Sequence, residues 1–364
     1  MISFAPTDDQ QQMRDVVRTV ALSHLRPASP VIEQDDAEID AALEAVGKLG
    51  LLQSAAEAAV QGDELYPRVL SAIVLEELAW GDVNTAASFA ATSAFVRTVA
   101  ELGSPQQKQA ILADYTREQN ASGAIAAVEK GLRWSPSRMS TSITKQGAGW
   151  VLDGTKTLVV QAAKSRHFLV VARDEHERFV GVVVPAEASG VLLGEPCETM
   201  GLTAQRSLDV VFDHVEVAPS QILAAGAPFD ISRLIAESWT ASAAILVGLS
   251  RAVYEHSVDY TKLRVAHGSE LARKQSVALT LVDIHTSVEA MRWSAWRAAS
   301  HLDKGATDGR SARLAHVLAS RRACWIADEG VQFMGGHGFI AENPVEAWYR
   351  NAHTVATMQV TFGL

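Results

Sequence analysis

Cysteine is nearly absent from this 364-residue chain, which holds only Cys197 and Cys324. Two cysteines so far apart in sequence support neither a disulfide framework nor a cysteine-rich metal cluster. Their scarcity fits a reducing compartment, and residues 1–10 show no basic segment followed by an apolar run, as a signal peptide would. We therefore expect a cytoplasmic protein and predict no metal site.

Basic charge and long apolar runs are also scarce. The chain has 32 Lys and Arg against 42 Asp and Glu, for a formal net charge of −10 and a pI near 5.6. No basic cluster is present that could neutralise a nucleic-acid backbone. The longest apolar stretch, Ala241–Leu249, falls short of the ~18 residues that span a membrane. We expect neither a nucleic-acid partner nor a membrane span, and interpret this stretch as part of a buried helix.

Several common catalytic motifs are missing as well. The 11 histidines include no His-Glu-x-x-His pair, and the chain contains neither a Walker loop nor a Gly-x-Ser-x-Gly elbow. These absences exclude the zinc-protease, P-loop and nucleophile-elbow classes of enzyme.

Hydrophobic periodicity divides the chain into three parts. Residues 7–119 show apolar side chains at helical spacing, and Ser104 followed by Pro105 predicts a helix start. From about 120 the period changes to two, with Asp153-Gly154 as a tight-turn signal and a second hairpin joining Phe168–Val171 to Phe179–Val184.

Helical spacing returns after Pro228. Long helices are predicted at roughly 231–265, 272–301 and 311–333. The order predicts an α+β, mostly α protein. We expect a helical domain at 1–119, a middle antiparallel β domain at 120–225 and a C-terminal four-helix bundle at 226–364.

Five segments resemble one known family. They are Glu76–Asp82, Gly103–Lys108, Met200–Leu202, Val211–Val217 and Gln332–Phe339. Together they resemble the acyl-CoA dehydrogenases over nearly the whole chain. The resemblance implies the same three-domain fold, FAD as cofactor and an oxidoreductase that converts acyl-CoA to 2-enoyl-CoA.

The resemblance also implies a set of cofactor-binding residues. Arg264, Gln275, Gln332, Gly335 and Gly336 match family positions that contact the pyrophosphate and adenosine side of a neighbouring chain's FAD. Guanidinium groups suit paired phosphate oxygens, and consecutive glycines let backbone amides approach a phosphate. Each feature also has a plain structural alternative: a charge at a helix end for Arg264, and a helix C-cap for the glycines.

Residues that would serve the chain's own FAD are replaced. The family's Thr-Glu-Pro-Gly-Ala-Gly-Ser-Asp segment reads here as 128–135, with Val128 for threonine and Trp134 for serine. The Trp-Ile-Thr element reads as Leu158-Val159-Val160. The two family positions for the catalytic glutamate hold Gln359 and Ser238, neither of which is a carboxylate base. We therefore assign no catalytic residue.

These losses leave three functions open. The first is a subunit that completes the FAD site of a paralogous acyl-CoA dehydrogenase subunit, in a heterotetramer that acts on an acyl-CoA in lipid or steroid catabolism, with electron-transfer flavoprotein as acceptor. The second is a self-sufficient homo-oligomeric dehydrogenase or oxidase that uses Glu237 as base. The third is a flavin-free scaffold.

Overall fold

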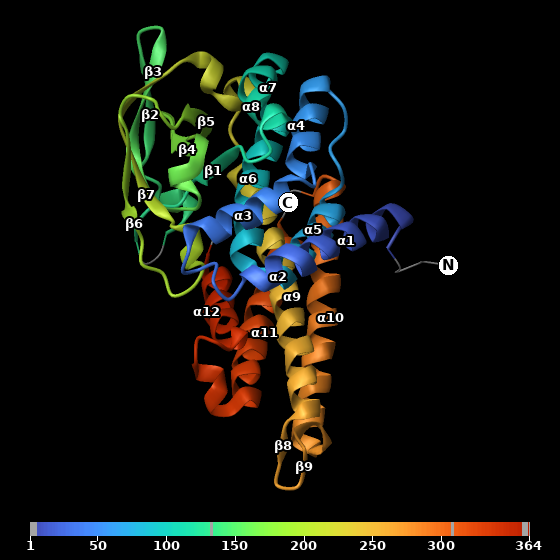
Figure 1. Cartoon of the computed structure of the whole chain (residues 1–364). Helices are drawn as coiled ribbons and strands as arrows, with labels where there is room; N and C mark the ends of the chain where they lie inside the picture. Colours follow the sequence, from blue (N-terminus) through green and yellow to red (C-terminus); the bar gives the residue numbers. More distant parts are fainter. Residues whose placement is uncertain (1–5, 132–133, 307–308, 359–362, 364) are drawn as a thin grey trace.

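The computed structural model describes residues 6–131, 134–306, 309–358 and 363 (Figure 1). Its N-terminal part is helical, as predicted. Ser104 caps α7 through a capping box with Gln107, and Pro105 is the first helical residue. Asp82 separates α5 from α6 and caps the latter by accepting from the Thr85 amide. The helices are α1 (Asp8–Val20), α2 (Arg26–Ala28), α3 (Asp36–Gly47), α4 (Leu51–Gln61), α5 (Arg68–Gly81), α6 (Val83–Leu102), α7 (Pro105–Ile111) and α8 (Ala113–Arg117).

The middle part of the described chain forms a seven-stranded sheet in the order β1-β4-β2-β3-β7-β6, with β5 also paired to β4. The strands are β1 (Ser122–Ala126), β2 (Ser142–Gln146), β3 (Gly149–Val159), β4 (Ser165–Arg173), β5 (Phe179–Pro185), β6 (Val191–Pro196) and β7 (Leu208–Val217). The predicted β4–β5 hairpin is confirmed. Most pairings are antiparallel, whereas β4 runs parallel to both β1 and β2.

The tight turn predicted at Asp153-Gly154 is wrong. Both residues lie inside β3, and the β2–β3 turn falls between Gln146 and Gly149 instead. Gly154 sits at an irregularity in the β3–β7 register with φ of 151°, and a Cβ there would meet the Thr141 Oγ1 atom at 2.5 Å. A bulge and a hairpin turn both favour glycine, so the dipeptide could not distinguish them.

The C-terminal part is the predicted bundle of α9 (Ile231–Leu263), α10 (Gln275–Asp303), α11 (Arg310–Met334) and α12 (Pro344–Thr357). The short strands β8 (Val265–Ala266) and β9 (Ser269–Glu270) join α9 to α10 and project from the lower end of the molecule (Figure 1). Residues 241–249 are buried in α9, as expected. None of the described helices is both long and apolar enough to cross a membrane. The predicted fold class is confirmed.

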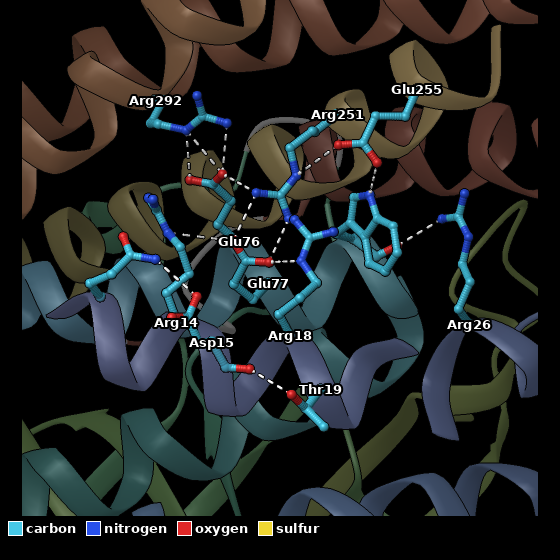
Figure 2. A network of polar contacts seen from close by, with 12 residues as sticks. Arg14, Asp15, Arg18, Thr19, Arg26, Glu76, Glu77, Arg251, Glu255 and Arg292 are labelled. Atoms are coloured by element: carbon cyan, nitrogen blue, oxygen red, sulfur yellow. Dashed lines mark hydrogen bonds and ion pairs between the residues drawn. The ribbon is translucent and has the colours of Figure 1, made fainter. Parts of the chain in front are cut away.

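A buried charge network joins the N-terminal helices to the bundle (Figure 2). Glu77, from α5, accepts hydrogen bonds from Arg18 of α1 at 2.6 Å and from Arg251 of α9 at 2.7 Å. Neighbouring Glu76 binds Arg251 and also Arg292 of α10. Burial would raise the pKa of Glu77, but the arginine contacts outweigh it and hold that pKa below its ordinary value. The network fixes four helices to one another.

Candidate functional site

A pocket of about 860 Å³ lies at the end of the bundle, where α9 and α11 finish and α10 begins. Four of the predicted cofactor residues line it, from segments about 70 residues apart: Arg264, Gln332, Gly335 and Gly336. Gln275 is the first residue of α10 and lies beside the lining rather than in it, whereas the adjacent Ser276 and Val277 do line the pocket.

Backbone hydrogen bonds fix the main chain of Arg264, and its side chain remains available to bind a ligand. Its amide donates to the Tyr260 carbonyl at 2.9 Å, and its carbonyl accepts from the Leu271 amide at 2.8 Å. The exposed guanidinium makes no hydrogen bond or ion pair with another described residue. It also stands at the C-terminal end of α9, where a cation suits the helix dipole. A fixed backbone carrying an unengaged cation is well placed to receive an anion from outside.

The glycines of the turn after α11 are subject to different structural constraints. Gly335 ends the helix with φ of 57°, which favours glycine. Gly338 packs so closely that a Cβ would lie 2.5 Å from the Val331 carbonyl oxygen. Gly336 has neither constraint, because its φ is not positive and no described atom lies within 4 Å of a Cβ position. Gly336 lines the pocket and has open space at its Cβ position, so a ligand could approach its backbone there.

The pocket also receives the start of α10. No side chain caps this 29-residue helix, so its first amides keep their partial positive charge toward the lining at Ser276 and Val277. Arg264 adds a full positive charge, His337 adds an imidazole and Glu329 a carboxylate. Together these groups can bind a phosphate-bearing ligand at one side and hydrogen-bond a polar group through Gln332.

A second pocket of about 700 Å³ lies between the sheet and α12. Val128, Trp134 and Leu158 contribute apolar walls, and Thr199, His353 and Thr357 are among its polar lining residues. The indole Nε1 of Trp134 is buried without a hydrogen-bond partner in the described chain. Val128 and Leu158 offer no side-chain hydrogen-bond group to this pocket, whereas the Trp134 N–H is a donor without an acceptor in the described chain.

Comparison with known proteins decides the family. Models of the acyl-CoA dehydrogenase N-terminal, middle and C-terminal domains match residues 7–119, 124–215 and 226–359. The chain belongs to the acyl-CoA dehydrogenase family. This is a family of FAD-dependent oxidoreductases, so the recognition from sequence motifs and the expected cofactor class are confirmed.

Individual relatives are similar to this chain over nearly its full length. The chain is 28% identical over 355 residues to cyclohex-1-ene-1-carbonyl-CoA dehydrogenase of Geobacter metallireducens, covering 95% of this chain and 93% of the relative. It is 26% identical over 352 residues to the rat mitochondrial short-chain specific acyl-CoA dehydrogenase, covering 95% and 85%. The solved butyryl-CoA dehydrogenase of Megasphaera elsdenii superimposes with a TM-score of 0.87 at 24% identity, covering 97% of this chain and 95% of that one.

Glu129 is the one acid that the chain keeps in the altered 128–135 segment, and its contacts are structural. It accepts from the amides and hydroxyls of Ser140 and Thr141, and from the Lys156 ammonium at 3.0 Å. Burial would raise the pKa of Glu129, but these bonds lower it to about 2. Burial lowers the pKa of Lys156 to about 8, although Glu129 opposes that shift. Sequence reasoning missed this pair, and the retention of Glu129 among changed neighbours was the available signal.

The alternative base, Glu237, is engaged elsewhere. Its carboxylate is buried and accepts two bonds from Arg68, at 2.6 and 3.1 Å. Arg68 also pairs with Glu101 at 2.5 Å. Neither Glu237 nor Ser238 lines the pocket walled by Trp134. The other family base position, Gln359, lies outside the described residues.

Proposed function

We propose that this chain is one subunit of a heteromeric acyl-CoA dehydrogenase and supplies the adenosine side of a paralogous partner's FAD site. The observation that carries the proposal is the contrast between the two pockets. The bundle-end pocket keeps Arg264, Gln332 and Gly336 and has an unengaged cation. The pocket that corresponds to the chain's own flavin site has apolar groups where the family places donors.

The bundle-end pocket suits a ligand that another chain delivers. Arg264 and the uncapped start of α10 would hold the FAD pyrophosphate. Gln332 would hydrogen-bond the adenosine portion, and the open face of Gly336 would let that portion approach the backbone. Bound in the partner, FAD would supply the hydride acceptor for oxidation of an acyl-CoA thioester to 2-enoyl-CoA. Electron-transfer flavoprotein is the acceptor that we propose for the assembled enzyme.

The same contrast argues against a complete active site within this chain. Loss of a donor toward a buried flavin costs about 1 to 3 kcal/mol for each group left unsatisfied, and Val128 and Val160 each replace a threonine hydroxyl of the family, while Leu158 replaces the stacking tryptophan. Glu237 would have to leave two hydrogen bonds from Arg68 before it could take a proton from a substrate. A homo-oligomeric enzyme that uses Glu237, and a flavin-free scaffold, are the alternatives that the experiment below separates.

The test begins with the chain purified alone and its absorbance near 450 nm. We expect a colourless protein that contributes to a yellow complex when coexpressed with a paralogue that retains Thr-Glu-Pro-Gly-x-Gly-Ser and the catalytic glutamate. In that complex, Arg264→Ala should lower the FAD affinity by about tenfold or more, the loss of roughly one charged hydrogen bond. Arg273→Ala is the matched control, because Arg273 is an exposed cation next to the same hairpin and pairs with Glu270.

Each other outcome selects an alternative. One such outcome is a lone chain that binds stoichiometric FAD, which octanoyl-CoA or a steroid acyl-CoA bleaches. If Glu237→Gln abolished that bleaching, the result would establish the homo-oligomeric enzyme. If Arg264→Ala left the FAD affinity of the complex with the paralogue unchanged, that result would contradict the shared site and favour the scaffold.

A further inference from the structure

A third pocket, of about 600 Å³, lies at the junction of the N-terminal helices and the sheet. Its walls come from α3, the start of α4 and α6, and its remaining side from residues 119–122 and Gln161. It shares no lining residue with either pocket described above. Pockets of this size at domain junctions are typical small-molecule sites.

Apolar and polar residues share the lining of this pocket. Leu43, Val46, Leu51 and Phe89 supply apolar surface, and the floor holds hydroxyl and amide groups from Ser88, Thr92, Ser122 and Gln161. Charged lining residues lie at the exposed rim, where Lys164 pairs with Asp40. Because burying an unpaired charge is costly, the enclosed part of a ligand must be uncharged.

Gln161 provides an unpaired acceptor in this floor. The residue is 5% exposed, and its Nε2 donates to the Ser88 hydroxyl oxygen at 2.8 Å. The single hydroxyl proton of Ser88 goes to the Asn84 carbonyl at 2.9 Å, so Ser88 can only accept from Gln161. This fixes the orientation of the amide. The Oε1 atom of Gln161 then has no donor among the described residues.

We propose that this pocket binds an uncharged, largely apolar small molecule with a hydroxyl group, which donates its proton to Oε1 of Gln161. The apolar walls would cover the hydrocarbon body, and Thr92 and Ser122 would lie beside the polar end. Gln161 has φ of 60°, a conformation that non-glycine residues seldom adopt, and that conformation carries its side chain to Ser88. This inference goes beyond the proposed function and does not depend on it.

The experiment uses 1-octanol and its isomer methyl heptyl ether as probes of the full chain, with binding followed by titration calorimetry and saturation-transfer NMR. We expect saturable binding of 1-octanol and about tenfold weaker binding of the ether, since the ether cannot donate to Oε1. Gln161→Met should bring the two affinities together. Ala41→Trp, on the exposed pocket wall of α3, should weaken octanol about tenfold by filling the space.

Ala290→Trp is the control, because Ala290 is also exposed but lies on α10, away from the pocket. Circular dichroism melting confirms that each variant is folded. Failure of wild-type protein to bind octanol saturably, or equal binding by wild type and Ala41→Trp, overturns the site. Equal affinity of wild type for octanol and ether overturns the role of Gln161.

Discussion

At the scale of single residues, Glu129 illustrates how a family position can keep a structural role after the neighbouring cofactor contacts have changed. Its carboxylate ties the loop at residues 140–141 to Lys156. We expect Glu129→Gln to lower the free energy of unfolding by about 3 to 5 kcal/mol, because Lys156 would stay buried without its counter-charge. Urea unfolding measures the change, with Glu216→Gln on the exposed face of β7 as control.

A double variant checks the reason for this loss. Lys156→Met combined with Glu129→Gln should destabilise the protein by less than the sum of the two single changes, since neither charge remains unpaired. Strict additivity would contradict the proposed pairing.

Asp82 gives the chain a pH-dependent stability at the start of α6. Burial raises its pKa from 3.8 to about 6, although hydrogen bonds from Thr85 and Ser29 partly oppose the shift. Between these values the folded protein keeps a proton that the unfolded chain has lost. The contribution of this carboxyl to stability is therefore full below about pH 4 and is lost as the pH rises through 6.

The Asp82→Asn variant isolates this effect, since it does not titrate and keeps an acceptor at the N-cap. The unfolding free energy of wild type minus that of the variant should fall by about 2 kcal/mol between pH 4 and pH 7. Denaturant unfolding across this range provides the measurement. A difference that stays constant with pH would show that Asp82 does not titrate in the window.

At the scale of elements, α1 depends on the network in Figure 2 for its position. Glu77→Gln removes the carboxylate that binds Arg18 and Arg251, and leaves those two guanidinium groups facing each other. We expect amide hydrogen exchange to rise across residues 8–20 and the protein to lose about 3 kcal/mol or more of stability. Gln11→Ala, on the exposed side of α1, is the control. Unchanged exchange in α1 would mean that apolar packing alone holds it.

At the scale of the whole molecule, Gly248 sets how closely the bundle approaches the N-terminal helices. A Cβ on this residue of α9 would lie 2.2 Å from the Glu76 carbonyl oxygen of α5. Gly248→Ala should destabilise the protein by about 3 kcal/mol in thermal or urea unfolding, because two helices must separate. Gly336→Ala is the matched comparison and should leave stability within about 0.5 kcal/mol, since its Cβ position is open.

In the assembled enzyme that we propose, Gly336→Ala should affect the cofactor instead of the stability of the fold. Gly336→Ala should weaken FAD retention while leaving the fold intact, because the added methyl group would stand where a cofactor approaches the backbone. Retention equal to that of wild type would contradict the assignment of Gly336.

Local sequence determined much of the fold. The capping box at Ser104, the long helices after Pro228 and the β4–β5 hairpin all depend on residues within a few positions of one another. The family and its cofactor class followed from short motifs, and the loss of hydroxyl donors at Val128 and Val160 was visible in the sequence alone. The limits of the three domains remain predictions.

Tertiary structure decided what depends on distant partners. Gly154 occupies a bulge because β3 pairs with β7 and packs on Thr141, and Glu129 and Glu237 are engaged because Lys156 and Arg68 reach them from other elements. The free Oε1 of Gln161 depends on Ser88, which lies 73 positions away. Sequence patterns record the preferences of a residue and its near neighbours. Which side chains meet across the fold is set by how the helices and the sheet pack.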